Sequence, residues 1–261
     1  MRRIIKAVRR FVRRRRRVDG LPTLTERKCD EVAAALQRAI LYIDGEVEGD
    51  VAEFGTRTGY TASIIANSMA DRGQRGGRKL WLFDSFEGLP KSTSDADISN
   101  PRVREGTWDE GTMKGLSPDE LRRRIGRFLS PDRIVIHEGW FANTLPRVPD
   151  TARFAMIHVD ADLYQSAMDC LVPLFERRLV SAGAVILFDD WNSGGARNEL
   201  GERRAWREIT EHYAVDFEDI GGHSSHGRSF IVHSYRGLTP PSLSLAAFDA
   251  LVLLPVAMLA S

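Results

Sequence analysis

Cysteine is scarce in this 261-residue chain, which contains only Cys29 and Cys170. Two thiols so far apart in the sequence exclude a disulfide framework and a cysteine-based zinc site, and they favour a reducing compartment such as the cytoplasm. Long apolar runs are also missing: no stretch reaches the roughly 20 residues of a membrane-spanning helix, and none has the form of a secretory signal. With 43% hydrophobic and 28% charged residues, the chain has the composition of a globular protein and the length of one α/β domain.

A large net charge is absent as well, since the formal charge is only +1. Residues 2–17, however, hold ten Lys and Arg and no acidic residue. The rest of the chain is therefore acidic, with a net charge of about −9, and we expect no nucleic-acid partner. Apolar residues alternate with the arginines of residues 1–17, which favours either a helix lying on an anionic membrane or a solvated basic arm. We treat residues 1–20 as a separate N-terminal arm.

Hydrophobic periodicity predicts alternating strands and helices over residues 21–236, and hence a single α/β domain. The predicted strands are residues 49–55, 79–84, 132–137, 154–162, 184–190, 214–220 and 228–235. The predicted helices are residues 21–43, 61–70, 117–128, 166–178 and 202–212.

Two of these strands are short apolar runs that end in paired aspartates. Their sequences are F-A-M-I-H-V-D-A-D and A-V-I-L-F-D-D. Unbroken apolar runs fit strands of a parallel sheet covered on both faces, and ligands bind where such strands end. The four carboxylates would repel one another unless they were protonated or bridged by a cation, and oxygen ligands suit Mg²⁺. We therefore predict a metal site formed by Asp160, Asp162, Asp189 and Asp190. Because residues two apart in a strand point to the same side, both Asp160 and Asp162 are expected to reach it.

The strand over residues 49–55 leads into a turn bracketed by Gly55 and Gly59, where a ligand can approach the backbone. This glycine pair lacks the lysine of a phosphate-binding loop and the third glycine of a dinucleotide site. Glu53 precedes the turn, where a carboxylate would repel phosphate and attract a cationic group such as an α-amino group.

The next two strands also end in candidate binding residues. Asp84 lies about 25 residues after the glycine turn, where an acid can accept two ribose hydroxyls. The alternative is that Asp84 only caps the following turn. Gly139 and Trp140 follow the third strand, where an adenine could stack, although Trp140 could equally be a core residue.

Three further segments have open interpretations. Residues 91–116 are polar and contain Trp108, so they form either a substrate-facing lid or a disordered loop. Residues 237–261 form an apolar tail that favours packing or an oligomer contact over membrane contact. His223 and His226 lack a third ligand of matching type, so we expect a polar loop in which His223 touches the substrate.

Four stretches in a fixed order resemble the macrocin O-methyltransferase (TylF/MycF-type) family of S-adenosylmethionine-dependent enzymes. They are V-A-E-F-G-T-R-T-G, F-D-S-F-E-G-L-P, I-H-V-D-A-D-L-Y and I-L-F-D-D, and the match runs over residues 49–235. The resemblance implies a Rossmann-like class I methyltransferase fold, with a mostly parallel sheet covered by helices on both faces. It also implies Mg²⁺-dependent methylation of a sugar hydroxyl on a secondary metabolite, as in antibiotic biosynthesis. Thr58 departs from the family, which often has glycine at this place in the turn.

The resemblance also assigns roles to residues. Glu53, Gly55 and Gly59 would frame the methionine part of the cofactor, Asp84 would bind its ribose, and Gly139 and Trp140 would border its adenine. The full set of expected cofactor-binding residues is Glu53, Gly55, Gly59, Asp84, Ser85, Gly139, Trp140 and Asp160. The expected metal ligands are Asp162, Asp189 and Asp190, with Asp162 also the expected catalytic base. Spacing alone does not decide which of Asp160 and Asp162 is ligand and which is base.

Two other functions fit parts of the sequence. A metal-dependent glycosyltransferase would use the Asp160 and Asp162 pair against a nucleotide diphosphate, and a non-catalytic scaffold would have no reason to gather four carboxylates. The acceptor expected for the methyltransferase is a small-molecule glycoside or a glycan, and residues 91–116 and 222–227 do not identify it.

Overall fold

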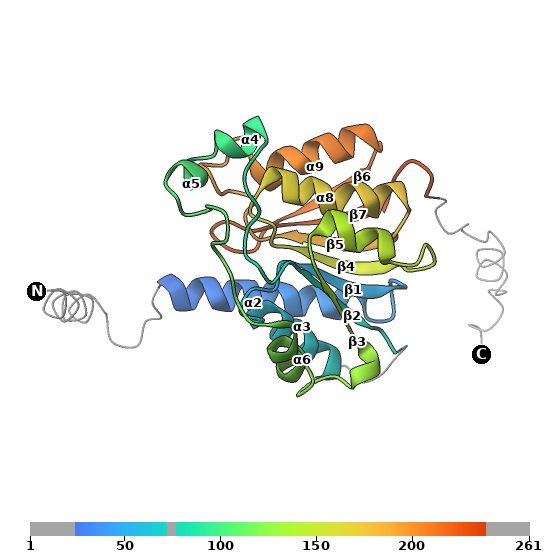
Figure 1. Ribbon diagram of the computed structural model, residues 1–261. Helices are drawn as coiled ribbons and strands as arrows, with labels where there is room; N and C mark the ends of the chain where they lie inside the picture. The colour runs from blue at the N-terminus through green and yellow to red at the C-terminus, as the bar shows by residue number, and fades with distance from the viewer. Residues whose placement is uncertain (1–23, 72–76, 239–261) are drawn as a thin grey trace, which may run out of the picture.

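The computed structural model describes residues 24–71 and 77–238 and contains a seven-stranded sheet in the order β3-β2-β1-β4-β5-β7-β6 (Figure 1). Strand β7 runs antiparallel to both of its neighbours, and the other pairs are parallel. The predicted mostly parallel α/β sheet is therefore confirmed. The strands are β1 (Asp50–Phe54), β2 (Leu80–Asp84), β3 (Ile134–Glu138), β4 (Phe154–Val159), β5 (Val180–Phe188), β6 (Asp216–Gly222) and β7 (Arg228–Ser234).

Helices cover both faces of this sheet (Figure 1). One face is covered by α2 (Leu24–Ile43), α3 (Tyr60–Asp71) and α6 (Pro118–Ile125), and the other by α7 (Phe141–Thr144), α8 (Tyr164–Glu176) and α9 (Gly201–His212). The short helices α4 (Asp95–Ile98) and α5 (Pro101–Arg104) and the 3₁₀ turns η1 (Pro131–Arg133) and η2 (Leu145–Arg147) lie in the connections.

The central strands bury side chains on both faces, which explains their unbroken apolar sequences. In β1, Val51 packs with the helices on the α2 side, whereas Ala52 and Phe54 pack on the α8 side. The Phe54 ring stacks on that of Phe83 in β2, with their centroids 4.6 Å apart. This core fixes the strand ends from which the candidate site projects.

The strand predicted over residues 154–162 ends earlier, and this changes the geometry of its aspartates. Strand β4 stops at Val159, and Asp162 adopts a left-handed backbone with φ of 58°. The prediction that both aspartates lie in the strand was therefore wrong, and the alternation rule does not explain why both line one cavity. Strand β5 likewise ends at Phe188, which leaves Asp189 and Asp190 in the following loop.

Residues 91–116 are folded rather than irregular throughout, since they contain α4 and α5. The buried Asp97 side chain joins this segment to α8. Its Oδ1 accepts the N–H of Tyr164 at 2.7 Å, and its Oδ2 accepts the N–H of Gln165 at 3.1 Å. The predicted lid segment is thus docked on the first turn of α8.

Within residues 24–71 and 77–238, no helix is both long and apolar enough to cross a membrane. The predictions of membrane contact by residues 1–17, of a separate arm over residues 1–20, and of packing or oligomer contact by nearly all of the tail fall outside the described residues.

Candidate active site

A cavity of about 280 Å³ opens at the carboxyl ends of the parallel strands, where the α/β rule places ligands. Most of the predicted site residues line it: Gly55, Asp84, Ser85, Trp140, Asp160, Asp162, Asp189 and Asp190. Three predicted residues, Glu53, Gly59 and Gly139, are not among its lining residues.

Three half-buried carboxylates cluster in the lining of this cavity. Asp160, Asp189 and Asp190 each offer an oxygen, and these oxygens all lie within 4.8 Å of one another. Burial, followed by the charges of Asp189 and Asp190, raises the pKa of Asp160 well above its ordinary value. Burial and the charge of Asp189 also raise the pKa of Asp190. Such a group relieves its repulsion by binding protons or a cation, so these oxygen donors fit a hard divalent ion.

Asp162 lies outside this group of three, although it was the predicted ligand. Burial, the charges of Asp190 and Asp160, and a hydrogen bond with Asp190 raise the pKa of Asp162 well above its ordinary value. The oxygens of Asp160, Asp189 and Asp190 are therefore the ones that lie within reach of one another, while Asp162 lines the same cavity and contacts Asp190.

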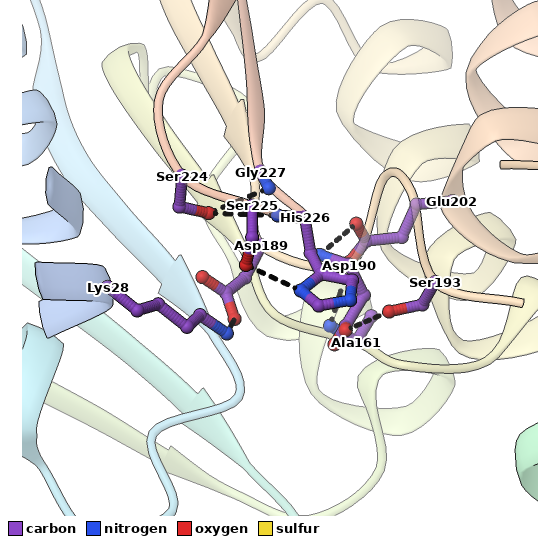
Figure 2. A network of polar contacts seen from close by, with 10 residues as sticks. All are labelled: Lys28, Ala161, Asp189, Asp190, Ser193, Glu202, Ser224, Ser225, His226 and Gly227. Carbon is purple, nitrogen blue, oxygen red and sulfur yellow. Dashed lines mark hydrogen bonds and ion pairs between the residues drawn. The ribbon is translucent and has the colours of Figure 1, made fainter. Parts of the chain in front are cut away.

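A lysine that the sequence did not single out also reaches the acids. Lys28 of α2 lines the cavity, and its Nζ lies 3.5 Å from Oδ2 of Asp189 (Figure 2). Burial opposes the charge on Lys28, but Asp189 and Asp190 outweigh it and raise its pKa. Lys28 and Asp189 lie 161 positions apart, so no local sequence pattern indicates this contact.

Glu202 of α9 is a second residue that sequence reasoning missed. Its side chain is fully buried, with Oε1 3.2 Å from the N–H of Ala161 and Oε2 2.9 Å from the N–H of Asp190 (Figure 2). The Ser193 hydroxyl donates to Oδ1 of Asp190 at 2.5 Å. In the sequence, Glu202 only marks the beginning of an amphipathic helix.

The turn between β6 and β7 places His226, rather than His223, at the cavity. The carbonyl of His226 accepts the N–H of Asn192 at 2.9 Å, which joins this turn to the loop after β5. His223 is buried, and its Nδ1 lies 2.7 Å from the Ser229 hydroxyl. His223 instead borders a separate cleft beside α2, so the predicted substrate contact by His223 has no geometric support at this cavity.

Asp84 holds the glycine turn in place. Its Oδ2 accepts the N–H of Thr56 at 2.7 Å, the Thr56 hydroxyl at 2.9 Å and the N–H of Arg57 at 3.0 Å. Its Oδ1 accepts the N–H of Phe86 at 2.7 Å. The capping alternative for Asp84 is therefore realised, and Asp84 also lines the cavity, where binding of a ribose stays a prediction.

Glycine is required at the two ends of the turn for different structural reasons. Gly55 has φ of 88°, and a Cβ there would lie 2.0 Å from the carbonyl oxygen of Asp160. Only glycine lets the turn after β1 approach the loop after β4 so closely. Gly59, with φ of 67°, instead packs against Leu121 of α6, where a Cβ would lie 2.8 Å from that side chain.

Glu53 and His158 form a buried pair within the sheet. Glu53 Oε1 lies 3.0 Å from His158 Nδ1, and both side chains are fully buried. Burial opposes the charge on His158, but Glu53 outweighs it and raises the histidine's pKa. Glu53 Oε2 has no hydrogen-bond partner among the described residues. Contact of Glu53 with a cationic ligand group stays a prediction.

Comparison with known proteins shows what the chain resembles. The sequence model of the macrocin-O-methyltransferase (TylF) family matches residues 9–220. An 8-demethyl-8-(2,3-dimethoxy-α-L-rhamnosyl)-tetracenomycin-C 4'-O-methyltransferase from Streptomyces olivaceus is 30% identical over 159 residues, which is 60% of this chain and 59% of the relative. Mycinamicin III 3''-O-methyltransferase from Micromonospora griseorubida is 30% identical over 159 residues, which is 60% of this chain and 61% of the relative. The match thus spans about three fifths of the length of these curated relatives.

Solved structures agree with this result. The O-methyltransferase NovP has a TM-score of 0.65 and 22% identity, covering 78% of this chain and 80% of that chain. The calicheamicin methyltransferase CalS11 has a TM-score of 0.62 and 23% identity, covering 77% of this chain and 78% of that chain. These similarities confirm the predicted class I methyltransferase fold. None of these proteins supports the glycosyltransferase alternative.

Proposed function

The chain belongs to the macrocin O-methyltransferase family, and from this premise we propose that it transfers a methyl group from S-adenosylmethionine to a sugar hydroxyl, with the help of Mg²⁺. The acceptor would be a glycoside or glycan of secondary metabolism, because the named relatives methylate sugar-bearing antibiotics or their precursors. The observation that carries the proposal is one cavity lined by both the glycine turn after β1 and three clustered carboxylates.

The cofactor would lie against the turn side of this cavity. Gly55 leaves room for close approach to the backbone. Asp84 and Ser85, which line the cavity, would border the ribose, and Trp140 would border the adenine. Gly139 would act through the backbone, since its N–H donates to the carbonyl of Asp84 at 2.9 Å. Glu53 and Gly59 would support the same turn from positions away from the cavity.

Asp160, Asp189 and Asp190 would hold the metal, because their oxygens already lie within reach of one ion. When bound, S-adenosylmethionine would supply an electrophilic methyl group, and the metal would stabilise negative charge on the acceptor oxygen. Asp162 lies beside this triad and is our choice for the base that would accept the hydroxyl proton, because it lines the same cavity. Burial raises the pKa of Asp162 well above its ordinary value, which makes its ionised form a stronger proton acceptor. The walls of the cavity would position the acceptor oxygen for transfer of the methyl group.

Binding measurements on Asp189→Asn test this function, with Asp216→Asn on the exposed edge strand β6 as the matched control. Isothermal titration should show that the wild type, Asp189→Asn and Asp216→Asn all bind S-adenosylhomocysteine. Binding of Mn²⁺, a stand-in for Mg²⁺, should weaken at least tenfold in Asp189→Asn alone, because one ligand of the triad is neutralised.

Two results would contradict the proposal. Binding of a UDP-sugar with metal, and no binding of S-adenosylhomocysteine, would restore the glycosyltransferase interpretation. Equal Mn²⁺ affinity in Asp189→Asn and Asp216→Asn would contradict the proposed metal site, and only the proposed methyl transfer would remain.

A further inference from the structure

Glu202 links the two acidic loops of the cavity. The Glu202 carboxylate accepts hydrogen bonds from two backbone N–H groups. One belongs to Ala161, which lies between Asp160 and Asp162, and the other belongs to Asp190. One buried side chain from α9 therefore bonds to the backbone of both loops, as Figure 2 shows.

This link begins where the sheet ends. The pairing of β4 with β5 extends only to Val159 and Phe188, and one more backbone bond joins the N–H of Asp189 to the carbonyl of Val159 at 3.0 Å. Beyond that bond the loops no longer hold each other by a regular ladder. Past the end of the sheet, the Glu202 side chain joins the two loops, next to the residues that carry the carboxylates.

The chemistry of the two partners requires a carboxylate. Both are N–H donors, and a carboxylate accepts at both of its oxygens, whereas a glutamine amide would turn an NH₂ group toward one of them. Full burial of an acid beside other acids is unfavourable, because both burial and the charges of Asp190 and Asp160 disfavour its ionised form. A role in packing alone would not explain a carboxylate at this position.

The next residue of α9 holds the same loop. Arg203 Nη2 donates to Oδ1 of Asn192 at 2.6 Å, and its guanidinium lies 4.9 Å from the ring centroid of Trp191. The first turn of α9 thus contacts the loop after β5 through two consecutive side chains.

We propose that Glu202 is a positioning residue that sets the spacing between the loop of Asp160 and the loop of Asp189 and Asp190 for a divalent cation. The inference rests on the metal-dependent function proposed above. Glu202 does not touch the substrate in this role, and it acts by orienting the backbone that carries the ligands. Outer-shell partners of this kind change metal affinity about 10- to 100-fold when they are replaced.

The test compares Glu202→Gln with Glu211→Gln, an exposed glutamate of the same helix. Titration with Mn²⁺, followed by its electron paramagnetic resonance signal, should show at least tenfold weaker binding in Glu202→Gln and unchanged binding in Glu211→Gln. Affinity for S-adenosylhomocysteine should stay within about twofold in both, because Gly55, Asp84, Ser85 and Trp140 lie outside α9 and Glu202 bonds instead to Ala161 and Asp190. Equal Mn²⁺ affinity in the two variants would overturn the inference.

Hydrogen exchange by NMR separates this inference from the function on which it rests. In the wild type, the amides of Ala161 and Asp190 should exchange slowly, and in Glu202→Gln both should exchange faster together. If the wild type binds no Mn²⁺, the metal-dependent function fails, and coupled exchange of these two amides still tests whether Glu202 links the loops. If Glu202→Gln does not fold, hydrogen exchange in the wild type still tests the inference. Independent or rapid exchange of the Ala161 and Asp190 amides would contradict a link through Glu202.

Discussion

At the scale of single residues, His223 shows how burial controls a charge. Burial lowers the pKa of His223 from 6.5 to about 4, while its Nδ1 stays paired with the Ser229 hydroxyl. Gly227 makes room for the ring, because a Cβ there would lie 2.2 Å from His223 Nε2. The folded protein therefore holds this histidine neutral.

This depressed pKa predicts acid sensitivity. The unfolded chain binds a proton at His223 near pH 6.5, whereas the folded chain resists it until about pH 4. The contribution of His223 to stability is therefore complete above pH 6.5 and is lost as the pH falls to about 4, with a maximum near 3 kcal/mol. We expect His223→Asn, which can keep the Ser229 contact, to flatten the pH dependence of the free energy of unfolding in this window.

Urea denaturation at several pH values from 4 to 7 measures this effect. His212→Asn serves as the control, because that histidine is exposed at the end of α9. A pH dependence that is the same in His223→Asn and in the wild type would show that His223 is not held neutral.

At the scale of elements, the segment containing α4 and α5 depends on one buried acid. Asp97 accepts hydrogen bonds from two N–H groups in the first turn of α8, and a third from the Ser94 hydroxyl at 2.8 Å. The N-cap residue of α8, Leu163, makes no side-chain capping bond. Asp97 therefore caps α8 from another part of the chain and docks the segment in the same contact.

We expect Asp97→Asn to lower the free energy of unfolding by about 1–2 kcal/mol, since an amide cannot accept at both positions. The segment should also be cut faster by protease between α4 and β3, because its contact with α8 weakens. Asp95→Asn changes an exposed acid of the same short helix and is the control. Equal stability and equal cleavage rates in the two variants would show that Asp97 does not dock the segment.

At the scale of the whole molecule, the acids of the cavity couple stability to pH and to metal. Burial and mutual repulsion raise the pKa values of Asp160, Asp162 and Asp190. A raised carboxylate pKa favours the folded state at low pH, and this contribution is lost as the pH rises through the folded-state pKa. Without metal, these acids therefore oppose the stability of the fold as they ionise.

Mg²⁺ should reverse this loss. We expect the stabilisation by Mg²⁺ relative to EDTA to increase as the pH rises and the acids ionise, because the ion competes with protons for the same oxygens. At 100 times its dissociation constant the ion should contribute about 2.7 kcal/mol. Thermal unfolding at each pH, with and without Mg²⁺, measures this difference. A difference that does not change with pH would indicate that the ion does not compete with protons for these carboxylates.

Much of this protein could be predicted from the sequence, because the signals were local. Apolar runs predicted the β4 and β5 strands and the aspartates that follow them, and the glycine turn and Asp84 came from spacing along the chain. Each of these signals depends on residues a few positions apart, which one strand, one turn or one helix is enough to organise.

The tertiary structure alone decided how these parts combine. The end of β4 at Val159 and the left-handed backbone of Asp162 determined which aspartate joins the triad. Lys28 reaches Asp189 from a helix 161 positions away, and Glu202 joins Asp190 to the N–H of Ala161, which lies 41 positions from Glu202. A hydrogen bond between distant residues leaves no periodic trace in either segment, because it depends on the packing of whole helices against the sheet. The sequence therefore determined which chemical groups the site contains, and the packing of α2 and α9 determined which of them meet.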